Sequence, residues 1–150
     1  MKKHLSWITM LLLVATISYG FKVKIVNVNK TGYSVVVPGD AETKFAKGFE
    51  IYKAKCAACH QLNGEGIAGA FPPLKNSDYL LADKKRAVEQ VLNGSNHEIT
   101  VNGAKYSIAM PPQVDNYEDA VAVINYVLNA WGNNGGTITV DEVKDIKIKR

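Results

Sequence analysis

The chain has 150 residues, 47% of them hydrophobic, and its 18 basic and 14 acidic residues give a net charge of +4. Two of the basic residues, Lys2 and Lys3, lie in an N-terminal leader pattern, and the rest of the chain has a net charge of +2. No basic patch is interleaved with aromatic residues, so composition argues against nucleic acid as a partner. The length suits one small domain with extensions at its ends.

Residues 1–20 have the pattern of a secretory signal peptide. Lys2 and Lys3 precede an apolar run from Leu5 to Ile17, which is followed by the small residues Ser18 and Gly20. The run is shorter than the about 20 residues that span a membrane. We therefore expect cleavage after Gly20 and export to the periplasm, with an uncleaved membrane anchor as the alternative.

Residues 21–39 form a segment of their own. Alternating apolar and polar residues on either side of Lys30-Thr31-Gly32 indicate two short strands joined by a turn, and Pro38-Gly39 ends the segment. An extended arm lying on the domain is the alternative, and docking of an edge strand to a partner is a weaker one.

Helical patterns begin at Asp40. Asp40 is a plausible N-cap for a helix that runs to about Lys55, with Gly48 in its interior. A glycine inside a helix costs about 1 kcal/mol against alanine, which predicts close approach of another helix at Gly48. A loop over residues 61–76 follows.

Two further elements are predicted before the last helix. A short helix covers about Asp83 to Leu92, and Asn93-Gly94 forms its C-cap. Residues 99–106 place strand-forming residues on both sides of Asn102-Gly103, which predicts a small β-hairpin.

The last long helix has the clearest boundaries in the sequence. Asp115 and Glu118 make a variant capping box, and Gly132 supplies the stop. An apolar stripe lies between them, as expected for a helix that covers the core. Residues 133–150 form a C-terminal extension, in which Thr139 and Glu142 make a second capping box.

The segment Cys56-Ala57-Ala58-Cys59-His60 contains the only two cysteines of the chain. The CxxCH spacing is that of covalent haem attachment, in which both thiols bond one porphyrin and the histidine becomes the proximal iron ligand. A redox-active disulfide should follow a strand of a βαβ unit, and an amphipathic segment precedes this motif instead. A zinc site would need two more ligands, and His97 is the only other histidine outside the leader.

From about Asp40 to Trp131 the chain resembles the class I, monohaem cytochromes c. The resemblance rests on CAACH, on Gly48 and Tyr52 eight and four residues before Cys56, and on the elements around them. It implies an all-α cytochrome c fold over residues 40–132, with small helices around one haem c bonded to Cys56 and Cys59. The hairpin is then an insertion, and residues 21–39 are an N-terminal arm.

The resemblance also assigns roles to single residues. Gly48 and Tyr52 should pack across the C-terminal helix at Tyr126. Pro72 lies twelve residues after His60, where the family has a proline whose carbonyl accepts a hydrogen bond from the proximal histidine. That bond would fix the imidazole tautomer.

Met110 is implied as the distal iron ligand. The family places its distal methionine just before the last long helix, and Met110 lies there, between Ala109 and Pro111-Pro112. It is the only methionine outside the leader. A gap-filling core residue is the alternative for Met110, and His97 is the competing ligand.

The function implied is that of an electron carrier and not an enzyme. Protein ligands on both sides of the iron favour one-electron exchange with a redox protein donor and acceptor. The hairpin and C-terminal extension resemble cytochrome c domains associated with nitrite reductases, oxidases or periplasmic dehydrogenases. The alternatives are a bound subunit of a periplasmic redox complex, and a haem sensor or peroxidase with a labile methionine. Lys53, Lys55 and Lys75 are candidate docking charges.

Overall fold

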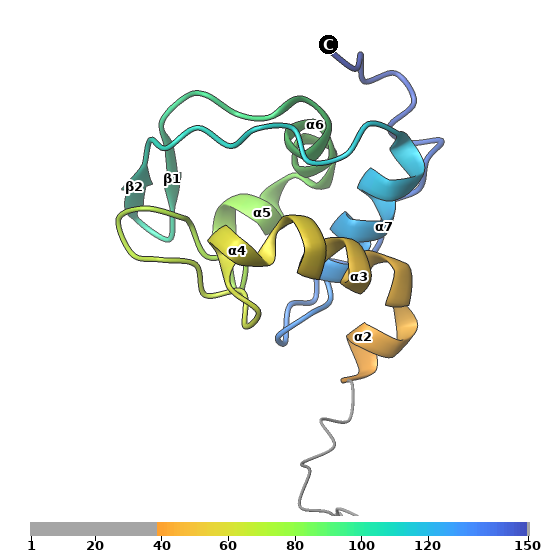
Figure 1. Cartoon of the computed structure of the whole chain (residues 1–150), viewed down its shortest axis with the longest axis horizontal. Coiled ribbons are helices and arrows are strands. Elements are labelled where there is room, and N and C mark those ends of the chain that lie inside the picture. The colour runs from red at the N-terminus through yellow and green to blue at the C-terminus, as the bar shows by residue number, and fades with distance from the viewer. Residues whose placement is uncertain (1–38, 150) are drawn as a thin grey trace, which may run out of the picture. The chain divides into compact units, whose positions relative to one another are not determined.

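The computed structural model describes residues 39–149 (Figure 1). The predicted signal peptide (1–20) and the arm (21–39, except Gly39) lie outside the described residues. In the described part, no helix is long and apolar enough to cross a membrane.

The regular elements of the described residues are helices and one two-stranded sheet, which confirms the all-α cytochrome c architecture and its hairpin. The elements in chain order are α2 (Asp40–Lys44), α3 (Ala46–Lys55), α4 (Ala57–His60), α5 (Asp78–Ala82), α6 (Lys84–Asn93), β1 (Ile99–Val101), β2 (Ala104–Tyr106) and α7 (Tyr117–Val127).

The first predicted helix is divided in two. Phe45 leaves the helical region, with φ −117° and ψ 46°, and separates α2 from α3. Gly39, and not Asp40, is the N-cap of α2. The prediction also missed α5, which is only five residues long and is capped by the Ser77 hydroxyl, 3.1 Å from the Leu80 amide. Such short helices lack a full apolar period, so their sequences carry little signal.

The last helix begins and ends at other residues than predicted. Asn116, and not Asp115, caps α7, because its side-chain oxygen accepts a hydrogen bond from the Asp119 amide at 2.8 Å. The helix ends at Val127, before the predicted stop at Gly132. The predicted helix near residues 83–92 is confirmed as α6, with Asp83 as its N-cap and Gly94, at φ 76°, as its C-cap.

α3 and α7 pack against each other (Figure 1), and Gly48 lies at their contact. A Cβ atom on Gly48 would lie 2.1 Å from the Ala122 carbonyl oxygen and 2.8 Å from the Tyr126 Cβ. Only glycine allows this approach, so the predicted reason for a glycine inside the helix is confirmed. The aromatic rings of Tyr52, Tyr126 and Trp131 pack together, with centroid distances of 5.1–5.6 Å between them.

The hairpin is fastened to the start of α5. Asn102 and Gly103 both have positive φ, 50° and 80°, as a type I′ turn requires. The Asp78 amide donates to the Asn102 side-chain oxygen at 3.1 Å, and the Asn102 amide donates to an Asp78 carboxylate oxygen at 2.8 Å. This reciprocal pair holds the turn against the helix.

The C-terminal extension packs on the domain core. Ile138, Val143 and Ile146 are buried in the same apolar cluster as α6 and α7. The Asn125 side chain of α7 donates to the Ile138 carbonyl at 2.9 Å and accepts from the Ile138 amide at 2.8 Å. The predicted Thr139–Glu142 contact forms, at 2.7 Å from amide to carboxylate, and turns without a regular helix follow it.

We predict that Gly48→Ala destabilises the protein strongly. The added methyl would meet backbone atoms of α7, which cannot move aside as a side chain can, so the free energy of unfolding should fall by about 3 kcal/mol, the upper range for overpacking. Urea denaturation of the haem-loaded protein measures this loss. Glu50→Ala, on the exposed face of the same helix, is the control and should change stability little. Wild-type stability of Gly48→Ala would contradict the close crossing.

We predict that Asn125→Leu loosens the C-terminal extension. The substitution leaves the Ile138 amide and carbonyl without their hydrogen-bond partners. Each buried group without a partner lowers the free energy of unfolding by about 1–3 kcal/mol. Hydrogen exchange at the Ile138 amide should accelerate, and the unfolding midpoint should fall. The control is Asn134→Ala, at an exposed asparagine. Unchanged exchange in Asn125→Leu would show that other contacts hold the extension.

Candidate functional site

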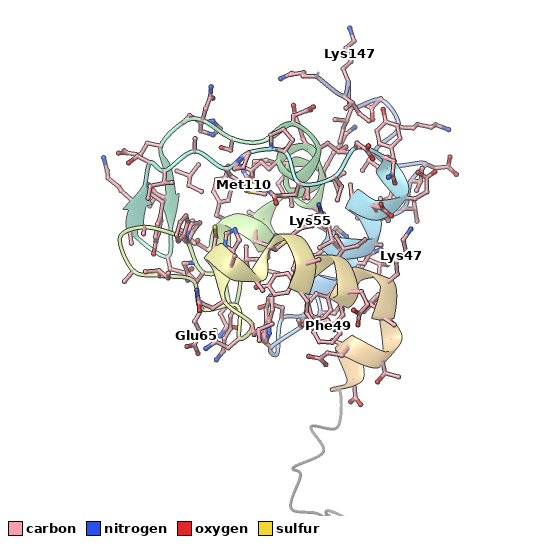
Figure 2. The ribbon with its side chains drawn as sticks, in the orientation of Figure 1. Lys47, Phe49, Lys55, Glu65, Met110 and Lys147 are labelled. Carbon is pink, nitrogen blue, oxygen red and sulfur yellow. The ribbon has the colours of Figure 1, made fainter. Side chains whose placement is uncertain are left out.

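A cavity of about 310 Å³ lies among the helices and is lined mainly by apolar side chains. Its volume is within the range of about 300–1,000 Å³ that ligand pockets have. Cys56, Cys59, His60 and Met110 all line it, so the structure brings together the predicted site residues, Pro72 included. Figure 2 shows Met110 on the inner side of the loop that connects β2 to α7.

The two thiols lie at the junction of α3 and α4. Cys56 joins the two helices and Cys59 belongs to α4, so the spacing places both on one helical face. Both thiols are free. Burial raises the pKa of Cys56 to about 11, and the neighbouring Cys59 adds to this. A thiol with so high a pKa lacks the thiolate character of a redox-active CxxC pair.

His60 is held as a neutral imidazole. Its Nδ1 donates to the Pro72 carbonyl oxygen at 2.9 Å, which leaves Nε2 with a free lone pair. His60 as a whole is 9% exposed. Burial lowers the pKa of His60, and the hydrogen bond to Pro72 only partly opposes this. An oriented neutral imidazole is the form that binds a metal.

Gly66 makes room for the Pro72 carbonyl. A Cβ atom on Gly66 would lie 2.6 Å from the Pro72 oxygen and 2.3 Å from the Phe71 oxygen, and its φ of 65° also favours glycine. Its amide donates to the His60 carbonyl at 3.0 Å. The sequence analysis did not assign a role to Gly66, although the glycine-rich loop after the CxxCH motif was the available signal.

Asn133 ties the loop after His60 to the end of α7. Its side-chain nitrogen donates to the Leu74 carbonyl at 3.0 Å and to the Val127 carbonyl at 2.7 Å. Its oxygen accepts from the Asn76 amide at 2.7 Å. Sequence reasoning missed Asn133, because a partner 57 residues away leaves no local pattern.

Met110 is anchored by the end of α6. Its backbone exchanges two hydrogen bonds of 2.8 Å with Ser95. A Cβ atom on Gly94 would lie 2.6 Å from the Met110 carbonyl oxygen. The C-cap glycine therefore also lets the loop that carries Met110 come close to the end of α6. His97 borders the same cavity from an exposed position, so the structure also brings the competing residue to the site.

Several polar residues that the sequence analysis did not single out also line the cavity, among them Tyr79, Gln90 and Tyr106. They come from α5, α6 and β2, which are separated in the chain. In a helix or strand this short, the sequence does not indicate which side of the element a tyrosine faces.

The docking charges differ from the expectation. Lys53 forms an ion pair with Glu50 at 2.8 Å, and Lys75 forms one with Glu65 at 2.9 Å. Lys55 lines the cavity and has no ion pair with any residue between 39 and 149. Of the three lysines, only Lys55 therefore lacks an ion-pair partner among the described residues, and it presents its charge beside the site.

The donor set fits a covalently bound haem. Two thiols, an oriented imidazole and a thioether share one apolar cavity, and these are the groups that hold haem in c-type cytochromes. A zinc site has no support in residues 39–149, where no cluster of three or more His, Cys, Asp or Glu side chains could hold a metal ion.

Comparison with known proteins identifies the family. Residues 45–131 match the cytochrome c family. The chain is 36% identical over 115 residues to cytochrome c-552 of Thermus thermophilus, covering 70% of this chain and 87% of that protein. It is 28% identical over 103 residues to the cytochrome c subunit of a quinone alcohol dehydrogenase from Gluconobacter oxydans (strain 621H), covering 67% of this chain and 22% of that subunit.

A third relative is the fructose dehydrogenase cytochrome subunit of Gluconobacter japonicus. The chain is 31% identical to it over 114 residues, which is 70% of this chain and 23% of that subunit. The chain therefore belongs to the cytochrome c family: it is a class I, monohaem c-type cytochrome, an electron carrier whose haem c is covalently bound.

Proposed function

We propose that His60 and Met110 are the two axial ligands and that the protein passes single electrons between a redox protein donor and acceptor. The observation that carries this is the convergence of an oriented imidazole and the Met110 side chain on one apolar cavity. When bound, haem supplies a reversible Fe(II)/Fe(III) couple, and a methionine ligand raises its potential.

The chain's own residues would orient both ligands of the iron and limit access to it. The hydrogen bond from His60 to Pro72 fixes the tautomer and raises the basicity of the ligand nitrogen. The pairing of Met110 with Ser95 holds the thioether loop in place. With His60 and Met110 as ligands, both positions would be filled by protein side chains, so a small substrate would have no access to the metal. This supports a carrier and not an enzyme.

A freely diffusing exported carrier is the form we favour. The chain spans most of the length of the Thermus cytochrome and less than a quarter of the dehydrogenase subunits. The C-terminal extension packs on the domain's own core, so it offers little to a larger complex. Export to the periplasm rests on the leader pattern of residues 1–20. A bound subunit of a periplasmic redox complex is the second candidate, favoured by the dehydrogenase relatives.

We predict that Met110→Ala opens the sixth coordination position. The ferrous protein should then bind carbon monoxide, the methionine–iron(III) absorption band should disappear, and the reduction potential should fall. Visible spectra with and without carbon monoxide measure this. Wild-type protein and His97→Gln are the controls, and both should keep a low-spin spectrum that the gas does not change.

Two results would count against the assignment of Met110. A low-spin spectrum retained in Met110→Ala but lost in His97→Gln would make His97 the ligand. Carbon monoxide binding by the wild-type protein at neutral pH would favour a sensor or peroxidase with a labile methionine.

We predict that Lys55 alone steers anionic redox partners to the site. Figure 2 shows Lys55 near Met110 in this view and Lys147 on the C-terminal segment. Lys55→Gln should slow oxidation by hexacyanoferrate(III) by up to about 20-fold at very low ionic strength, the effect of one charge about 7 Å from a trivalent anion in water. Stopped-flow rates at several salt concentrations measure this, and the difference should vanish at high salt. An equal effect of Lys147→Gln would show that only net charge matters.

A further inference from the structure

The chain leaves α4 in a backbone conformation that side chains rarely adopt. His60 is the last residue of α4, and Gln61, the C-cap, has φ 62° and ψ 157°. This region is almost confined to glycine, which has no Cβ atom to meet the neighbouring backbone. Another residue stays there only where the surrounding contacts prevent it from relaxing. The turn directly after His60 is therefore strained, and other groups must hold it closed.

A buried phenol holds the carbonyl of the strained residue. The Tyr52 hydroxyl donates to the Gln61 carbonyl oxygen at 2.5 Å, and the Gly64 amide donates to the same oxygen at 3.1 Å. Tyr52 belongs to α3 and is fully buried. Its ring packs against the rings of Tyr126 and Trp131 at 5.4 and 5.1 Å between centroids. The hydroxyl is thus fixed in its direction toward the turn.

Trp131 holds the next carbonyl along the chain. Its indole nitrogen donates to the Leu62 carbonyl oxygen at 3.0 Å. Its ring also lies against Gly64, where a Cβ atom would come within 2.4 Å of it. Two consecutive carbonyls after His60 therefore receive donors from the aromatic cluster. The rings alone would fill the core between the helices, so these donors serve the turn and not the helix contact.

The strained turn begins the loop that returns to His60. The Gly66 amide donates to the His60 carbonyl at 3.0 Å, which folds the loop back onto the end of α4. Pro72 follows in the same loop, and its carbonyl accepts the hydrogen bond from His60 Nδ1 at 2.9 Å. Relaxation of Gln61 would change the direction of the loop at its start. The Pro72 carbonyl would then move relative to the imidazole that it orients.

From these contacts we infer that Tyr52 is a positioning residue for His60, an inference that rests on the proposed function. Its hydroxyl keeps the strained Gln61 turn closed, and the closed turn places the Pro72 carbonyl against the imidazole. Tyr52 is not among the residues that line the cavity, so it acts through the backbone. A phenylalanine would keep the ring packing and lose this role.

The test removes the hydroxyl and keeps the ring. Wild type, Tyr52→Phe and Tyr126→Phe are loaded with haem, labelled with isotopic histidine and reduced. NMR then measures how fast the His60 Nδ1 proton exchanges with solvent, and the reduction potential is measured in parallel. Tyr126→Phe is the matched control, because Tyr126 belongs to the same aromatic cluster and its hydroxyl donates to Glu42 at 3.5 Å instead of to the loop.

Tyr52→Phe should speed the exchange of the His60 proton about five- to tenfold, the equilibrium factor that one lost hydrogen bond produces. Tyr126→Phe should leave the rate unchanged. A weaker bond to Pro72 makes the imidazole a poorer electron donor, which stabilises oxidised iron less, so the reduction potential of Tyr52→Phe should rise. A tyrosine that served packing alone would change neither the histidine proton nor the potential.

A double variant tests the strain itself. Adding Gln61→Gly to Tyr52→Phe should return the exchange rate toward that of wild type, because glycine adopts this conformation without strain and no longer needs the hydroxyl. If Tyr52→Phe alone yields no haem protein, recovery of haem protein in the double variant supports the role, and a failure to recover it overturns the role.

Equal exchange rates in Tyr52→Phe and wild type would overturn the positioning role while leaving His60 ligation intact. An equal acceleration in Tyr126→Phe would overturn it too, since this would report general loosening of the cluster. The same holds for an accelerated rate that Gln61→Gly does not reverse. A wild-type spectrum in which His60 shows no signal of a haem-bound imidazole would overturn the proposed function and the positioning role together.

Discussion

The close crossing of α3 and α7 is the contact on which the rest of the site depends. It exists because Gly48 lets the Ala122 carbonyl approach to a distance that no side chain would tolerate. α3 runs directly into Cys56 and α4, so the position of the thiols and of His60 follows from how α3 lies on α7. The aromatic rings of Tyr52, Tyr126 and Trp131 fill the space around the crossing and oppose any sliding of the two helices.

Backbone contacts, more than side-chain packing, place His60 and Met110, the two residues proposed as axial ligands. Gly66 admits the Pro72 carbonyl that orients His60, and Gly94 admits the Met110 carbonyl. Asn133 and the Ser95 pairing then fasten the two loops to α7 and to the end of α6. A redox centre held this way needs little rearrangement when its charge changes, because the groups around it are already committed to hydrogen bonds.

The electrostatics of the site suit electron exchange more than chemical transformation. The walls are mainly apolar, burial lowers the pKa of His60, and two of the three candidate docking lysines, Lys53 and Lys75, are paired with Glu50 and Glu65. Exposed ion pairs contribute little to stability, but these two reduce the positive charge that the candidate lysines can offer to a partner. Lys55 is left beside the site, and steering by one lysine is weak and easily screened.

The CAACH motif by itself determined the cofactor class and predicted His60 as the proximal ligand, because covalent haem attachment demands that spacing. The sequence also predicted the Gly48 crossing, the hairpin at Asn102-Gly103 and the His60–Pro72 bond, since each depends on local conformation or on a family pattern. Only the tertiary structure showed that Asn133 joins the loop to α7, that the C-terminal extension belongs to the core, and that Tyr79 and Tyr106 border one cavity. These are contacts between segments distant in the chain, and chain packing, not local propensity, decides which of them meet.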